Sequence, residues 1–376
     1  MTSNLRKSFF LITFLFLVSD LSAQKIEYSR DGQTLAVNWA IDIAAADDFS
    51  QFLLYDVKTG KLKSSFNSTE TPKSMIFSND SKTLVIGERL LLEKIGIDKS
   101  EKLSLSENPV SIENLSIDRK FQDQINADFL GFALSPDGKT LYKLFPNFLN
   151  AYTFPDLKFQ PEKSRAIKLN EKAKFHEHFI AVSSDASVVV ESEYAKVPSL
   201  VIKETGKPAA KTALTKNENG EPFEDLRGTI SQNNETLMLK STDNAGLYWQ
   251  IGFFDLKKHA LLGVFSTEAF GTNYENNLYP IENAAISPNG KKAAINYKSY
   301  DEDGETLSVT EIYDIAAKES VSFDVKLADY LRFAESIAFS PDSKQVATLS
   351  TKSASGSITT KVQIWDAETG KLIREF

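Results

Sequence analysis

The chain of 376 residues contains no cysteine, and this absence limits its chemistry before any pattern is considered. Without thiols there is no disulfide framework, no cysteine nucleophile and no thiolate metal site. Histidine occurs only three times, which leaves few general bases and few imidazole ligands. Neither a Gly-x-Ser-x-Gly sequence nor a glycine-rich phosphate-binding loop is present. The sequence therefore predicts no catalytic residue and no cofactor.

The charge and hydropathy of the chain argue against two further classes of interaction. Acidic residues outnumber basic ones, 51 to 43, and the formal net charge is −8. Because nucleic-acid affinity depends on lysine and arginine contacts to phosphates, this balance argues against a nucleic-acid partner. Beyond the first residues, no apolar run approaches the roughly 20 residues that a membrane-spanning helix needs. No membrane span is therefore predicted in the rest of the chain.

The first 23 residues have the pattern of a secretory signal peptide. Arg6 and Lys7 precede an apolar run from Phe9 to Val18, and small residues follow up to Ala23. The alternative is an uncleaved membrane anchor, but this run of ten is short of the roughly 20 residues that an anchor needs. We therefore expect a signal peptide at residues 1–23, a single domain at residues 24–376, and export to the periplasm or secretion.

The rest of the chain repeats one phrase seven times: an apolar strand, a turn of the type Ser-x-Asp/Asn, and a second apolar strand. The turn serines recur every 48 to 57 residues, at Ser29, Ser78, Ser135, Ser183, Ser231, Ser287 and Ser340. A period near fifty that contains several strands and almost no helix is typical of a β-propeller with one blade per repeat. We predict an all-β fold of seven four-stranded antiparallel blades, which begin near residues 26, 75, 132, 180, 228, 284 and 337.

The last repeat is the clearest copy. Residues 336–350 (SIAFSPDSKQVATLS) have the alternation of strand a, a turn and strand b, and residues 361–376 (KVQIWDAETGKLIREF) that of strands c and d. The AFSPD sequence and the Ile364-Trp365-Asp366 ending of strand c resemble the WD40-repeat family. The Gly-His pair of many family repeats is absent, so the chain resembles the divergent, exported members. The resemblance implies a propeller that acts as a display platform.

An aromatic residue followed by aspartate ends strand c in four repeats. The pairs are Tyr55-Asp56, Phe254-Asp255, Tyr313-Asp314 and Trp365-Asp366. We interpret them as blade architecture: the aromatic ring fills the space between blades, and the carboxylate accepts N–H groups of the next turn. Each blade is expected to be a continuous stretch of sequence, with blade 7 packed on blade 1 through side chains alone.

Unequal loop lengths distinguish one face of the predicted platform. The resemblance implies that the b–c and d–a connections emerge together on one face, which we call the long-loop face. Its long segments are 40–50, 300–305 and 351–359 between strands b and c, and 106–128, 216–226, 266–280 and 326–333 between blades. Binding residues concentrate on loops that a rigid scaffold holds. The alternative is that loop insertions are merely tolerated there, because they cost little.

Aromatic residues on two of these loops are the predicted partner-binding residues: Phe270, Tyr274, Tyr279, Tyr297 and Tyr300. Tyrosine suits such a role because it offers a stiff apolar face with a polar tip. The alternative is that these rings only cover the ends of the blades.

The sequence contains two groups of possible metal ligands, but it predicts no metal site. Asp301, Asp303 and Glu305 surround a glycine as in part of a calcium loop, but the rest of the twelve-residue pattern is missing. This run is more typical of a solvated hairpin tip. His176 and His178 would share one face of a strand and thus one metal ion. A third ligand is lacking, because His259 is expected on the opposite side of the platform.

The channel of a propeller is lined by strand a, and these strands are mostly apolar here. Glu27 is the one charged residue in the strand-a segments 26–28, 75–77, 132–134, 180–182, 284–286 and 337–339. The sequence therefore favours an exported, non-enzymatic binding or scaffold propeller whose partner is a protein, a peptide or a glycan. The alternative is a lactonase-like or dehydrogenase-like propeller enzyme with a site at the central channel.

Overall fold

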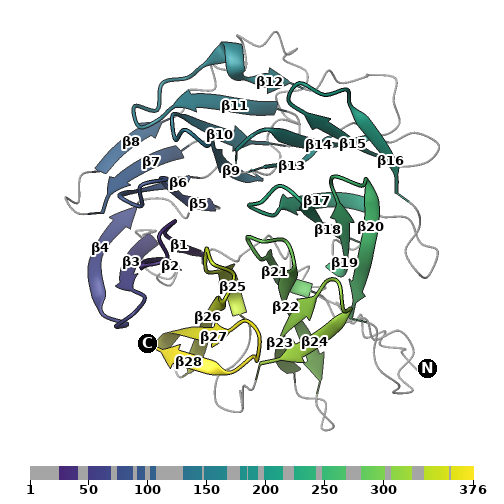
Figure 1. Ribbon diagram of the computed structural model, residues 1–376. Helices are drawn as coiled ribbons and strands as arrows, with labels where there is room; N and C mark the ends of the chain where they lie inside the picture. The colour runs from purple at the N-terminus through teal and green to yellow at the C-terminus, as the bar shows by residue number, and fades with distance from the viewer. Residues whose placement is uncertain are drawn as a thin grey trace, which may run out of the picture.

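The computed structural model describes residues 25–40, 50–68, 74–87, 91–97, 102–106, 130–145, 148–166, 178–183, 185–193, 199–214, 224–242, 248–267, 281–300, 306–323, 334–354 and 357–376. Within them, 28 strands form seven four-stranded antiparallel sheets. The sheets stand as blades in a ring around a central channel (Figure 1). The structure confirms the predicted all-β, seven-bladed propeller.

Every blade is one continuous part of the sequence, with its strands in chain order from the channel to the rim. Blades 1 to 3 consist of β1 (Lys25–Tyr28), β2 (Thr34–Ala40), β3 (Ser50–Asp56), β4 (Leu62–Ser68); β5 (Ser74–Phe77), β6 (Thr83–Gly87), β7 (Leu91–Gly96), β8 (Lys102–Ser106); and β9 (Gly131–Leu134), β10 (Thr140–Leu144), β11 (Phe148–Thr153), β12 (Arg165–Ala166). A short 3-10 turn, Pro161–Lys163, precedes β12.

The remaining four blades have the same order. They consist of β13 (His178–Val182), β14 (Val188–Glu193), β15 (Ser199–Glu204), β16 (Ala210–Ala213); β17 (Glu224–Ile230), β18 (Thr236–Thr242), β19 (Tyr248–Asp255), β20 (Ala260–Ser266); β21 (Ile281–Ile286), β22 (Lys292–Tyr300), β23 (Thr306–Asp314), β24 (Glu319–Ser322); and β25 (Ala334–Phe339), β26 (Gln345–Ala354), β27 (Ser357–Asp366), β28 (Leu372–Glu375).

The turn between strands a and b is held by the same hydrogen bonds in all seven blades, and we call this arrangement the serine clamp. The serine Oγ donates to the Asp or Asn Oδ1 two residues later, at 2.6 to 2.8 Å. The same Oγ accepts the backbone N–H five residues after the serine, at 2.8 to 3.0 Å. The clamp thus closes the hairpin and explains why the serine recurs.

The residue after the Asp or Asn of each clamp adopts a left-handed conformation. Its φ lies between 54° and 70° in all seven blades, whether it is Gly32, Gly138, Gly290, Ser81, Ala186, Asn234 or Ser343. A left-handed residue after a type I turn matches the twist of a hairpin. The face that carries the seven clamps, together with the c–d turns, is called the clamp face below.

The aromatic-Asp pairs have the architectural role predicted for them. The Asp366 carboxylate accepts the N–H of Glu368 at 3.1 Å and of Thr369 at 2.8 Å. The Trp365 ring stacks on Phe323 of the previous blade, with ring centroids 4.6 Å apart. Its Nε1 donates to Thr348 Oγ1 at 3.0 Å, so the buried indole is fully satisfied.

The hydrophobic core is divided among the seven seams between neighbouring blades. Each seam has its own cluster of buried apolar side chains, drawn from both blades. Between blades 5 and 6, for example, Phe253 and Tyr313 stack with centroids 5.5 Å apart. Burying one such aromatic side chain stabilises the fold by about 1.5–3 kcal/mol. The seams differ in size: the cluster between blades 4 and 5 is much larger than the one between blades 3 and 4.

The seam between blades 7 and 1 uses main-chain groups as well as side chains, which corrects the expectation of side chains alone. The Ile26 N–H donates to Ser336 Oγ at 3.1 Å. Arg374 donates to the Lys58 carbonyl oxygen. The Phe376 ring lies 4.9 Å from that of Tyr55. No described strand pairs across this seam, so each blade remains a separate sheet.

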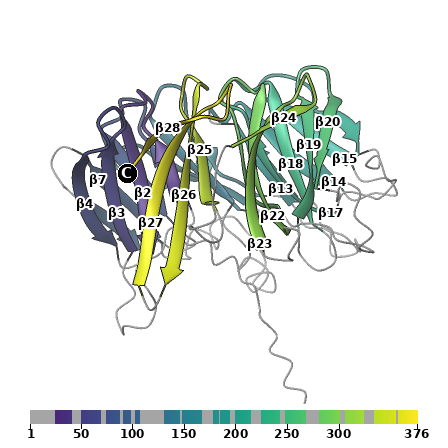
Figure 2. The same cartoon turned by 90° about the horizontal axis from the view of Figure 1, so that it is seen from below.

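One predicted loop is a strand pair instead. Residues 351–359 were expected as an irregular b–c loop, but β26 and β27 continue their ladder to the pair Ala354 and Ser357. The backbone ladder holds this hairpin although its sequence is polar and lacks apolar alternation. Figure 2 shows the hairpin extending beyond the other blades on the long-loop face.

Candidate functional site at the channel mouth

The end of the channel on the long-loop face is a largely polar ring built from one level of the seven strands a, the level that pairs with the residue nine positions after the turn serine. The residue four positions before the turn serine occupies this level in six blades: Lys25, Ser74, Gly131, Arg227, Asn283 and Ser336. In blade 4 a bulge lies between Phe179 and Ala181, and the backbone places His178 at this level, paired with Ser192. The next level is largely apolar, with Ile26, Met75 and Ile337 among its residues.

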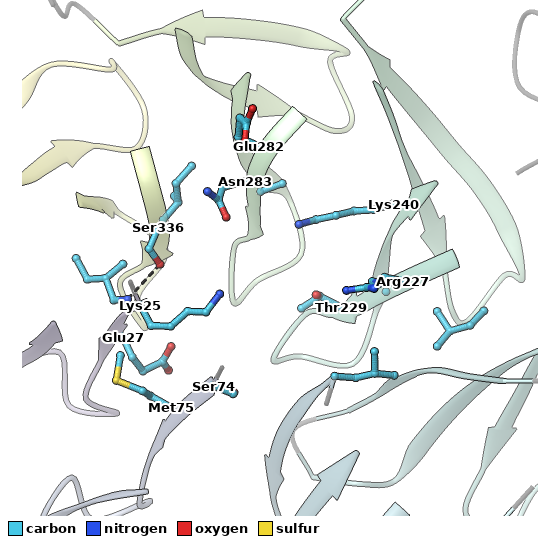
Figure 3. Close-up of a pocket in the computed structure, with 16 residues that line it drawn as sticks. Lys25, Glu27, Ser74, Met75, Arg227, Thr229, Lys240, Glu282, Asn283 and Ser336 are labelled. Atoms are coloured by element: carbon cyan, nitrogen blue, oxygen red, sulfur yellow. Dashed lines mark hydrogen bonds between the residues drawn. The ribbon is translucent and has the colours of Figure 1, made fainter. Parts of the chain in front are cut away.

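A cavity of about 360 Å³ opens within this ring, and we call it the channel mouth. Its charged lining residues are Lys25, Glu27, Arg227, Lys240 and Glu282. Figure 3 shows the cationic ends of Lys25, from β1, and of Arg227 and Lys240, from β17 and β18, directed into the cavity from its two sides. The mouth therefore concentrates positive charge on a chain whose net charge is −8.

Glu27 lies at the floor of the channel mouth. It also lines a cavity of about 270 Å³ on the clamp-face side, so the two cavities meet at its level. Burial raises the pKa of the Glu27 carboxyl to about 7, against the opposing effect of the Arg30 charge. Near neutral pH this carboxyl therefore exists in both protonation states, and the net charge of the mouth depends on which state is present.

A larger cavity of about 900 Å³ lies on the clamp face at the seam of blades 7 and 1. Its charged side chains already serve the turns around it. Asp31 and Asp342 accept from the serines of their own clamps, and Arg374 donates to the Lys58 carbonyl oxygen. The channel mouth is the better candidate for a functional site, because it gathers charged side chains from separate blades around one central cavity.

Of the predicted partner-binding residues, Tyr297 is the one whose side chain the structure describes. Its hydroxyl donates to Glu311 Oε1 at 3.0 Å, and its ring lies 6.1 Å from that of Phe265. Burial, followed by the charge and hydrogen bond of Glu311, raises the pKa of the Tyr297 hydroxyl. Phe270, Tyr274 and Tyr279 lie outside the described residues, and Tyr300 is placed by its backbone alone, at the end of β22. The prediction for these residues stays open.

Most of the possible metal ligands also lie outside the described residues. Asp301, Asp303, Glu305 and His176 lie outside the described residues, and His178 is known only as the first backbone position of β13. The paired residues Tyr300 and Thr306 flank segment 301–305. Among the residues that the structure describes, no three His, Asp or Glu side chains are grouped as metal ligands.

The channel mouth was not predicted from the sequence, because the strand-a segments in six blades began after this level and none was assigned in blade 5. They included Glu27 but left out Lys25, Asn283 and, in blade 5, Arg227. The signal that reveals them is the residue four positions before each turn serine, which is polar or glycine in six of the seven blades. Lys240 then follows from antiparallel pairing, because it lies opposite Arg227.

Comparison with known proteins adds the fold alone. No protein-family model matches the chain, and no curated protein matches it. A hydrazine synthase structure from Kuenenia stuttgartiensis has a TM-score of 0.54 at 13% identity, covering 93% of this chain and 98% of that one. Hsv2 of Kluyvelomyces marxianus has a TM-score of 0.51 at 11% identity, covering 93% and 97%. The β-propeller domain of Myceliophteria thermophila Cps50 (Swd1) has a TM-score of 0.52 at 10% identity, covering 90% and 95%.

These likenesses and the seven sheets show that the chain has the fold of a seven-bladed β-propeller. In the described part of the chain, no helix has the length and apolar character that crossing a membrane requires.

Proposed function

We propose that this protein is an exported, non-enzymatic scaffold that binds a protein or peptide partner through its long-loop face, centred on the channel mouth. The observation that carries the proposal is the polar ring there, with charged side chains directed into a cavity of about 360 Å³. A propeller holds such a ring rigidly, because each strand a is fixed by its own sheet. The pattern of residues 1–23 supports export.

The absence of cysteine allows a direct test, because one introduced thiol is a unique attachment point. A photo-crosslinker is attached to Ser353→Cys, on the β26–β27 hairpin of the long-loop face. The matched variant is Lys344→Cys, on the exposed blade 7 turn of the clamp face. Both proteins are exposed to the exported fraction of the source cells, and the cross-linked species are identified by mass spectrometry and reconstituted from purified components.

A defined partner that cross-links from Ser353→Cys and not from Lys344→Cys supports the proposal. Equal cross-linking from both faces, or cross-linking from the clamp face alone, contradicts it. A glycan that stays bound to the protein, with no polypeptide cross-linked, would contradict a protein or peptide partner. The partner would then be that glycan.

The alternative is an enzyme with its site in the channel. A propeller of similar fold occurs in a hydrazine synthase structure, so we retain an enzyme as the alternative, although a likeness at 13% identity shows the fold alone. Elemental analysis and native mass spectrometry of the protein purified from its exported fraction distinguish the two. A stoichiometric metal or small molecule would contradict the non-enzymatic proposal and direct attention to His176, His178 and segment 301–305.

A further inference from the structure

The cations of the channel mouth come from two separate parts of the ring. Lys25 belongs to blade 1, whereas Arg227 and Lys240 are cross-strand neighbours in blade 5. Their charged ends are directed into one cavity from opposite sides (Figure 3). Like charges brought together in this way repel one another. A ligand of opposite charge would be stabilised by all three.

The charge of the mouth is opposite to that of the whole chain. Lys25, Arg227 and Lys240 exceed Glu27 and Glu282 by one charge when both carboxyls are ionised, and the chain carries −8. A nucleic acid would meet this overall negative charge along its phosphate backbone, and its affinity depends on many cationic contacts. A short acidic group needs only the local cations. A cavity of about 360 Å³ is also near the lower limit of ligand pockets, which suits one or two side chains.

The donor types also favour carboxylates. Arginine presents a planar fork of N–H donors that matches the two oxygens of a carboxylate, and lysine adds point charges. Thr229, Asn283 and Ser336 line the same cavity and supply neutral polar groups beside the cations. Charge-assisted hydrogen bonds within a partly enclosed cavity are stronger than the same bonds at an open surface.

We propose that the channel mouth recognises the carboxylate side chains of an acidic segment of a protein partner. The proposal rests on the proposed function, because it names the chemistry by which the long-loop face selects its partner. Lys25 holds the ligand from blade 1, and Arg227 and Lys240 hold it from blade 5. The rest of the long-loop face contributes buried contact area to the complex. The mouth selects the partner by its charge and increases the association rate.

The test uses the full protein and a labelled hexaglutamate peptide with both ends blocked, measured by fluorescence anisotropy. Blocked hexaglutamine and hexalysine are the matched probes. Hexaglutamate should bind at least about tenfold more tightly than either control, and its affinity should fall as salt rises. Arg227→Gln and Lys240→Gln should each weaken binding by about tenfold, because each removes a charge-assisted hydrogen bond. Lys344→Gln, on the clamp face, should leave the affinity unchanged.

A charge reversal keeps the test decisive if a neutral variant folds poorly. Lys240→Glu should lose hexaglutamate binding and gain affinity for hexalysine, a result that partial unfolding cannot produce. Thermal unfolding of every variant is recorded as the control. Lys25→Arg should retain binding, because it keeps the charge at blade 1.

Several results would overturn the proposal. These are equal binding of hexaglutamate and hexaglutamine, no effect of the Arg227 and Lys240 variants, or tighter binding of a carboxylated glycan such as hexagalacturonate. Tighter binding of an oligonucleotide would do the same. If hexaglutamate does not bind while the partner still cross-links through Ser353→Cys, the carboxylate proposal fails and the scaffold function stands. If the long-loop face captures no partner either, both fail.

Discussion

The clamp face and the channel mouth lie at opposite ends of the same seven innermost strands, yet their residues follow different rules. At the clamp face every blade has the same serine, an Asp or Asn two residues later, and the same two hydrogen bonds. At the channel mouth the corresponding level reads Lys, Ser, Gly, His, Arg, Asn and Ser around the ring. A turn has a fixed geometric requirement, so its residues repeat. The corresponding level at the channel mouth lies before the turn and differs in residue type from blade to blade.

This comparison predicts a separation of effects. Substitutions in the clamps should lower the free energy of unfolding and leave hexaglutamate binding unchanged. Substitutions of the mouth cations should change hexaglutamate binding by about tenfold, whether or not they also change the free energy of unfolding.

The largest effect is expected from Gly290→Ala in the blade 6 clamp. Its φ is 68°, and an added Cβ would lie 2.6 Å from Thr236 Oγ1 and 3.0 Å from Ser231 Oγ of blade 5. Backbone strain of about 1–2 kcal/mol and overpacking of about 1–3 kcal/mol should together lower the free energy of unfolding by about 2–5 kcal/mol. Denaturant unfolding measures this value.

The matched control is Gly206→Ala in blade 4. Its φ of 79° imposes the same backbone strain, but nothing lies within 4 Å of the added Cβ. Gly206→Ala should therefore lower the free energy of unfolding by only about 1–2 kcal/mol. Equal losses in the two variants would show that contact between neighbouring clamps contributes nothing to stability.

Ser29→Ala removes one complete serine clamp. Ser29 is fully buried, and its Oγ accepts the Thr34 N–H and donates to Asp31. The unpaired N–H should lower the free energy of unfolding by about 1–3 kcal/mol, measured by urea denaturation. Ser65→Ala, on an exposed position of β4, should change it by less than about 0.5 kcal/mol. A clamp variant as stable as this control would mean that the turn forms without its serine.

At the mouth, Glu27→Gln should reveal the raised pKa of Glu27. Because the folded pKa is about 7 and the ordinary value is 4.5, the folded state holds its proton more tightly than the unfolded state. The resulting stability is fully present below pH 4.5 and is lost as the pH rises through 7. Glu27→Gln should therefore be more stable than the original protein by about 1–2 kcal/mol at about pH 8, with no difference near pH 4. Urea denaturation at both pH values checks this.

The same carboxyl should make ligand binding depend on pH. An anionic ligand favours the neutral form of Glu27, so hexaglutamate affinity should fall severalfold between about pH 6 and pH 8. The charged residues that line the mouth with Glu27 are Lys25, Arg227, Lys240 and Glu282, and Arg30 acts on it from the next turn. His178 occupies the same level on β13, and histidine ordinarily titrates in this range. A pH dependence that persists in Glu27→Gln would therefore belong to another group.

The smallest effect is expected from exchanging aspartate and asparagine in a clamp. Hydrogen bonds from the Ser135 hydroxyl and the Lys139 N–H lower the pKa of Asp137. The stability that ionised Asp137 contributes to the fold is present above the ordinary aspartate pKa, and it is lost as the pH falls through the lowered pKa of Asp137. Asp137→Asn should therefore lose less stability than the original protein in urea denaturation between about pH 4 and pH 2. Asn289→Asp, in blade 6, should gain this acid sensitivity.

The difference between the two ends also explains what the sequence could predict. The seven blades follow from Ser29 and its six counterparts, because a clamp residue leaves a repeated signal. Lys25 and Arg227 leave a weaker signal, since their level repeats only a polar residue or glycine, in six of the seven blades, and not one residue type. The β26–β27 hairpin was predicted as a loop because its backbone pairing, up to Ala354 and Ser357, does not depend on apolar alternation. Positions that a turn geometry fixes are thus easier to recognise in one sequence than positions whose residue type varies between blades.

The contiguity of the blades has a consequence for the history of the chain. No described sheet contains strands from two repeats, and the seam between blades 7 and 1 is held by contacts of the same kind as the others. A circular permutation that opened the ring at any other seam would therefore leave every described sheet intact. Gene duplication could likewise insert or remove a whole blade without breaking a ladder. The blade, not the ring, is then the unit on which such rearrangements act.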